Sequence, residues 1–66
     1  MADIGVLKTE VKKLSARAMT LKMNLHDLSE ELPINWQSIP QVAQETYDAF
    51  RTLEEKRAEL RQAEAS

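Results

Sequence analysis

Apolar residues recur at alternating steps of three and four along the first half of this 66-residue chain. The repeat is unbroken from residue 4 to residue 32, and its members are Ile4, Leu7, Val11, Leu14, Ala18, Leu21, Leu25, Leu28 and Leu32. Such a heptad repeat places one apolar stripe along a helix and is typical of a helix that packs against another helix. It predicts a first helix over about 4–31, with Asp3 as its N-cap and Pro33 disfavouring the α conformation at the residue before it.

A second helix is predicted over about 39–63, after a turn at 32–38 that contains Pro33. Ser38 and Gln41 match the capping box of a helix start, with Pro40 at a position that needs no backbone donor. The same alternation of three and four then continues through the apolar positions Ile39, Ala43, Thr46, Phe50, Leu53 and Leu60. On one flank the stripe is widened by Val42, Ala49 and Ala63.

A connection of this length makes the two helices antiparallel neighbours. The predicted fold class is all-α, and the predicted domain is a single helical hairpin over 1–66. In the register that aligns the two repeats, Leu21 faces Phe50, Leu25 faces Thr46 and Ala18 faces Leu53. Arg57 then falls opposite Leu14, along which its methylene groups can lie.

A hairpin this small has a thin core, because a domain of about 60 residues buries only about 60% of its unfolded surface. The sequence contains no cysteine, so neither disulfides nor a thiolate zinc site can add stability. Chains of this size then commonly share an apolar face with another copy. We therefore expect a homodimer in which two antiparallel coiled-coil hairpins form a four-helix bundle.

A second group of side chains follows the first helix on a face away from the leucines. Ala16, Met19 and Met23 would form, with Val42 and Ala49, an oligomer interface, since methionine packs well in irregular contacts. The alternative is a metal site at His26, with Met23 and Glu30 as companions on the same face. Imidazole, thioether and carboxylate groups bind divalent transition metals, and a two-fold axis could pair the histidines of two chains.

Trp36, in the turn, also has two interpretations. Its indole could cover the end of the apolar core against Leu32 and Ile39. Alternatively, it could bind a partner protein, since tryptophan is enriched at the energetic centres of interfaces.

The charge pattern argues against several classes of function. With 9 basic and 11 acidic residues, the net charge of −2 is not that of a dedicated nucleic-acid binder. The basic cluster of Lys8, Lys12, Lys13 and Arg17 leaves RNA as a less favoured partner. No apolar run approaches the roughly 20 residues of a membrane span, and no secretory signal is present, so we expect a cytoplasmic protein. No phosphate-binding loop or paired-histidine motif is present, and we expect no enzymatic activity.

Three segments of the chain resemble a small family of Rop-like two-helix proteins that is associated with nitrogen-fixation gene clusters. They are Glu10–Ala18 (EVKKLSARA), Lys22–Pro33 (KMNLHDLSEELP) and Val42–Tyr47 (VAQETY). The most specific part is the Lys-Met-x-Leu-His-Asp-Leu run followed by Leu-Pro. The resemblance covers nearly the whole chain.

The resemblance implies an antiparallel hairpin that dimerises into a bundle and is connected with nitrogen fixation, in a family whose biochemical role is undefined. Our leading hypothesis is a non-catalytic bundle that binds a partner protein, such as a nitrogenase-assembly protein, or a metal during nitrogenase maturation. Some relatives are catalogued as metalloproteins, which implies a ligand role for His26. Two alternatives stay open, a metal-free structural or adaptor dimer and an RNA-binding bundle. The RNA alternative rests on fold analogy alone.

Overall fold

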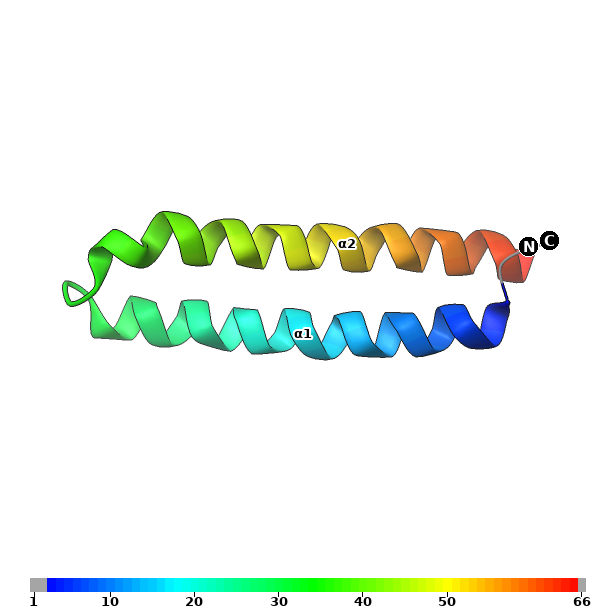
Figure 1. Ribbon diagram of the computed structural model, residues 1–66, viewed down its shortest axis with the longest axis horizontal. Coiled ribbons are helices and arrows are strands. Elements are labelled where there is room, and N and C mark those ends of the chain that lie inside the picture. The colour runs from blue at the N-terminus through cyan, green and yellow to red at the C-terminus, as the bar shows by residue number, and fades with distance from the viewer. Residues whose placement is uncertain (1–2, 66) are drawn as a thin grey trace.

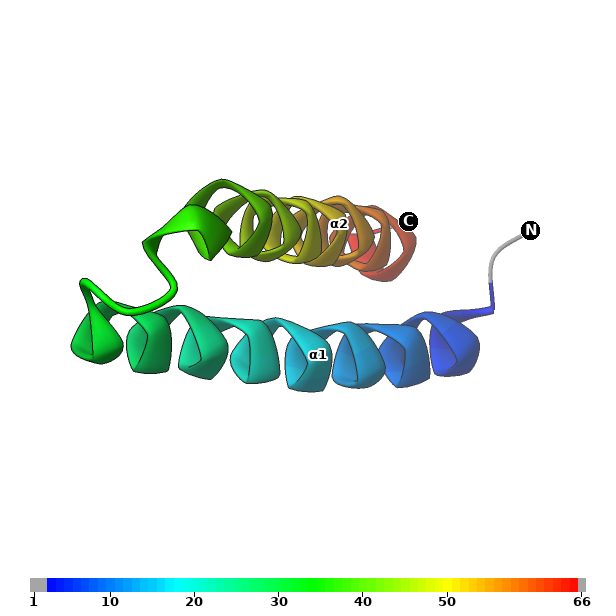
Figure 2. The ribbon, with the colours of Figure 1, turned by 60° about the vertical axis from the view of Figure 1, so that its left-hand side comes forward.

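The structure, a computed structural model, describes residues 3–65; residues 1, 2 and 66 of the expected domain lie outside this range. It consists of helix α1 (Ile4–Glu31), the 3₁₀ turn η1 (Trp36–Ser38) and helix α2 (Ile39–Ala65). The two helices lie antiparallel and side by side, so that α1 starts where α2 ends (Figure 1). The hairpin is a rod of 49 × 15 × 14 Å, and Figure 2 shows that its two helix axes are inclined to each other. The predicted helical hairpin is confirmed.

The first turn of α1 is capped by Asp3, as the sequence predicts. Asp3 has extended backbone angles, and its Oδ1 accepts a hydrogen bond of 2.8 Å from the backbone N–H of Gly5. A Cβ at position 5 would lie 3.3 Å from that oxygen, which is tighter than an ordinary contact. Glycine at this position therefore leaves room for the capping carboxylate.

We expect Asp3→Ala to lower the free energy of unfolding by about 1 kcal/mol, because it leaves a backbone donor of the first turn without its partner. Urea denaturation followed by far-UV circular dichroism measures this change. Asp3→Asn is the control, since asparagine caps helices as well as aspartate does. Equal losses for both variants would contradict a capping role.

The elbow between the helices reverses the chain through two short hydrogen-bonded turns. Ile34 N–H donates to Glu31 O at 3.0 Å, and Ser38 N–H donates to Asn35 O at 2.9 Å. Asn35 has a φ of 62° and a ψ of 26°, in the left-handed region that asparagine tolerates better than most residues. The elbow therefore contains asparagine at the one position where its backbone needs a positive φ.

The predicted capping box at Ser38 does not form. The side chain of Gln41 donates from Nε2 to Glu45 Oε1 at 3.2 Å, one turn further along α2. The reason lies in η1, where the N–H of Ile39 already donates to Trp36 O. Because η1 leads directly into α2, the 3₁₀ turn satisfies a donor at the helix start in place of a side-chain cap.

The register of the hairpin differs from the predicted one by one helical turn. Thr46 Oγ1 lies 3.4 Å from the carbonyl oxygen of Leu21, whereas the aligned repeats place it opposite Leu25. Nearer the open end of the hairpin, Lys56 Nζ lies 3.0 Å from Glu10 Oε2 and agrees with the shifted register. Counting from these two contacts places Ala18 opposite Ala49.

The shift comes with a rotation of α2. The central core consists of Ala18, Leu21, Ala49 and Leu53, with Val11 and Leu14 packed against it. Ala49 is only 7% exposed, while Phe50, which was predicted to face Leu21, is 37% exposed. The small side chains of Ala18 and Ala49 allow the two helices to approach closely, whereas a phenyl ring between the helices would push their axes apart. The flank of Val42 and Ala49 therefore replaces that of Ala43 and Phe50 in the contact between the helices.

Candidate functional site

The elbow exposes a group of large apolar side chains, which we call the elbow patch. Its members and their exposed fractions are Leu32 (41%), Ile34 (66%), Trp36 (59%) and Ile39 (38%). The indole of Trp36 thus lies mostly outside the hairpin. Of its two interpretations, this exposure favours the partner anchor over the cover of the core. Exposed indole and aliphatic groups gathered at one end of a rod are typical of a protein-binding surface.

His26 and Glu30 lie in contact on the outer face of α1. Nε2 of His26 is 3.0 Å from Oε1 of Glu30, and the two side chains are 60% and 69% exposed. Met23, the other predicted companion, is 53% exposed one turn earlier. Within residues 3–65, no group of three or more His, Cys, Asp or Glu side chains is placed to bind a metal ion. One chain offers two strong donors and a thioether, so a complete site needs donors from a second chain.

The residues predicted for an oligomer interface divide between two environments. Met19 and Met23 are about half exposed, and Ala16 is exposed on the same helix. Val42 is half-buried, and Ala49 lies in the contact between α1 and α2. Within this hairpin, a second chain can reach the methionines and Ala16 but has little access to Ala49.

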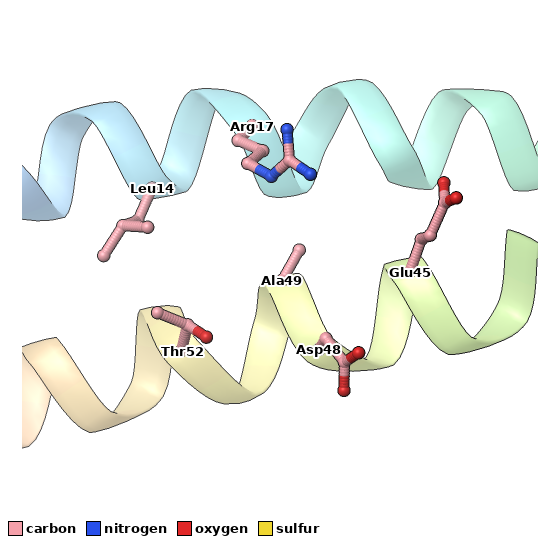
Figure 3. Close-up of a pocket in the computed structure, with 6 residues that line it drawn as sticks. All are labelled: Leu14, Arg17, Glu45, Asp48, Ala49 and Thr52. Atoms are coloured by element: carbon pink, nitrogen blue, oxygen red, sulfur yellow. The ribbon is translucent and has the colours of Figure 1, made fainter.

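A groove runs along one side of the hairpin between the two helices (Figure 3). It has a volume of about 220 Å³ and is lined by Leu14, Arg17, Glu45, Asp48, Ala49 and Thr52. Ala49 points toward α1 at its floor, and charged side chains of both signs form its edges. A neighbouring recess of about 260 Å³ shares Leu14 and Thr52 and adds Glu10, Lys13 and Lys56.

The sequence and the fold of this hairpin match known proteins over nearly the whole chain. Residues 2–65 match the family described as Rop-like. The chain belongs to the Rop-like family. The resemblance identified from the three sequence segments is therefore confirmed.

Among relatives of this Rop-like chain, a UPF0437 protein of Azorhizobium caulinodans is 63% identical over 65 residues, which is 98% of this chain and 94% of the relative. A UPF0437 protein of Frankia alni, described as lying in the nifX-nifW intergenic region, is 44% identical over 51 residues, or 77% of this chain and 62% of that protein. An NMR structure from a structural genomics consortium shares 45% identity with a TM-score of 0.88, and the match covers 98% of this chain and 92% of that one. Neither helix of the Rop-like chain, within residues 3–65, is both long and apolar enough to cross a membrane.

Sequence reasoning missed one exposed flank of the Rop-like hairpin. Phe50 (37% exposed) was placed in the core, and Ile39 (38% exposed) opposite Leu32. Phe50 and Thr52 are two residues apart, which is about 200° around a helix, so Phe50 lies on the side of α2 away from the groove. The bulk of Phe50 beside the small Ala49 was the signal in the sequence that could have indicated the rotation.

The Rop-like hairpin has an ion pair between its helices at the open end. Lys56 Nζ lies 3.0 Å from Glu10 Oε2 and 3.4 Å from Glu59 Oε2. Glu10 Oε2 is shielded from solvent, with Lys56 Nζ beside it. Glu10 first, and then Glu59, raise the pKa of Lys56 above its usual value of 10.5.

This ion pair predicts a pH dependence of stability. Because the folded pKa of Lys56 is raised, its contribution is fully present below about pH 10.5 and is lost as the pH rises through the folded pKa. We expect the urea midpoint of the wild type to fall more steeply above pH 10.5 than that of Glu10→Gln. If the urea midpoints of the two proteins fall equally with pH across this range, the ion pair of Lys56 with Glu10 contributes nothing to stability.

Proposed function

We propose that this Rop-like protein is a non-catalytic dimer that binds a partner protein during nitrogenase maturation. The observation that supports this best is the exposed indole of Trp36 within the elbow patch, 59% exposed at the end of the rod. The position of the Frankia alni relative in a nifX-nifW intergenic region supports the link to nitrogen fixation. An adaptor needs an exposed contact surface, and the elbow patch at the end of the hairpin offers one.

The dimer we propose is a four-helix bundle that covers the flank of Phe50. This side chain is 37% exposed in a single hairpin, although it continues the apolar repeat of α2. Val11 and Leu25 of α1 are only partly buried and are available to the same bundle core. The stripe of Ala16, Met19 and Met23, predicted as the interface from sequence, is the competing surface.

Genetic complementation tests the adaptor function. A nitrogen-fixing strain that lacks the gene is complemented with the wild type, with Trp36→Ala or with Tyr47→Ala. Tyr47 is the matched control, because it is an equally exposed aromatic residue (63%) outside the elbow patch. We expect Trp36→Ala to reduce nitrogenase activity and Tyr47→Ala to leave it unchanged. Full function of Trp36→Ala would contradict the proposal.

A second candidate function, metal binding, is favoured by the 3.0 Å contact between His26 and Glu30. In this version a divalent transition metal is bound by His26, with Glu30 and Met23 as companions, and further donors come from a second chain. Calorimetric titration of the untagged protein with Ni²⁺ or Zn²⁺ tests it. Stoichiometric binding that is lost in His26→Ala supports the site. The absence of binding by the wild type leaves the metal-free adaptor dimer.

RNA binding is the remaining alternative. The net charge of −2 and the exposed carboxylates near the elbow oppose it. Retention of the protein on RNA, weakening steeply as salt is added, would favour the RNA-binding bundle over the adaptor.

A further inference from the structure

Charge is strongly segregated along the rod. Residues 23–50 contain no lysine or arginine and have five acidic residues, so their formal charge is −5. The rest of the chain contains all nine basic residues and six acidic ones, for a formal charge of +3. Because the hairpin turns at 32–38, the acidic segment forms the elbow half of the rod and the basic remainder forms the open half (Figure 1).

The acidic side chains near the elbow are available to a partner. Asp27, Glu30 and Glu31 lie in the last turns of α1, directly before the elbow patch, and all three are exposed. Glu30 forms an ion pair with the neighbouring His26, while the lysine and arginine side chains that form ion pairs within residues 3–65, Arg51, Lys56 and Arg57, lie on α2 beyond the acidic segment. The elbow therefore presents an apolar tip with a collar of carboxylates, Asp27, Glu30 and Glu31, that form no ion pair with a lysine or arginine of residues 3–65.

We propose that the elbow inserts into an apolar recess rimmed by lysine and arginine side chains on the partner protein. This inference rests on the proposed adaptor function and defines the chemistry of the partner. Trp36 and Ile34, the most exposed apolar side chains of the elbow, enter the recess, because convex indole and aliphatic groups bind most strongly where they are fully desolvated. Asp27, Glu30 and Glu31 stay at the rim, where opposite charges orient the approach and exclude acidic competitors.

The same charges argue against two other occupants of the elbow. An anionic membrane surface attracts basic segments and repels a half-rod of charge −5. Nucleic acid is repelled for the same reason, since its binding depends on the neutralisation of phosphates by basic side chains. A protein recess with a basic rim satisfies both the apolar tip and its collar.

Site-specific photocrosslinking tests the surface and its chemistry. The photoreactive residue benzoylphenylalanine replaces Trp36, Met23 or Arg61 in nitrogen-fixing cells, and mass spectrometry identifies the crosslinked peptide. Position 61 is the control, near the C-terminal end of α2 in the basic open half of the rod. We expect crosslinks from position 36 to a peptide in which apolar residues are flanked by lysine or arginine. Crosslinks from position 23 alone would keep the adaptor function and overturn the elbow inference, and an acidic crosslinked peptide would overturn the basic rim.

A matched pair of charge variants tests the collar. The first combines Asp27→Asn, Glu30→Gln and Glu31→Gln, and the second combines Glu54→Gln, Glu55→Gln and Glu64→Gln, which remove the same charge from the open half. We expect the first to lower the crosslink yield from position 36 about tenfold, and the second to change it less than about twofold. Circular dichroism checks that both variants stay helical. Equal yields for the two variants would show that the collar does not contribute to recognition.

Discussion

Replacement of Leu53 by alanine is expected to leave the protein largely unfolded at room temperature. Leu53 is 2% exposed and belongs to the central core with Ala18, Leu21 and Ala49. Truncation of a buried leucine costs about 2–5 kcal/mol. A single core in a chain this short rarely supplies more than about 3–5 kcal/mol, so the loss is comparable to the whole stability. Helicity from far-UV circular dichroism, measured against urea concentration, gives the result.

Two controls separate this effect from a general sensitivity to mutation. Leu53→Met retains nearly the same volume and should cost less than about 1.5 kcal/mol. Leu32→Ala removes a leucine that is 41% exposed and should have a much smaller effect on unfolding of the hairpin. A cooperative transition of Leu53→Ala with an unchanged urea midpoint would contradict the packing described for the core.

Phe50→Glu is expected to convert the proposed dimer into monomers. In the proposed bundle, the ring of Phe50 is covered by the second chain, and a carboxylate there would lose apolar contact and be desolvated without a partner. A combined cost above about 4 kcal/mol corresponds to a rise of about a thousandfold in the dissociation constant. Sedimentation velocity over a concentration series measures the change. Far-UV circular dichroism shows whether the separated hairpins remain helical.

Met19→Glu is the matched control for Phe50→Glu, because it places the same charge on the competing surface. If the dimer covers the Phe50 flank, Met19→Glu should dissociate the protein much less. If Met19→Glu separates the chains and Phe50→Glu does not, the methionine stripe predicted from sequence is the interface. Dimers that persist in both variants would exclude both surfaces.

Local features of this protein could be read from neighbouring residues in the sequence. The cap at Asp3 depends on groups two residues apart, and the contact of His26 with Glu30 depends on one helical turn. The exposure of Trp36 was undecided, because it depends on whether the elbow folds back over the end of the core. The capping box predicted at Ser38 does not form, because the N–H of Ile39 at the start of α2 donates to Trp36 O within η1.

The sequence by itself determined the hairpin, because an unbroken heptad repeat, a proline after it and a second repeat allow no other simple arrangement. The register and the rotation of α2 were decided by tertiary structure. Heptad repeats can be paired in registers one turn apart with similar matching of large and small residues. Only the packing distinguishes them, since the close approach of the helices at Ala18 and Ala49 leaves no space for Phe50. The same register and rotation of α2 leave Phe50 exposed, on a surface that is available to a second chain.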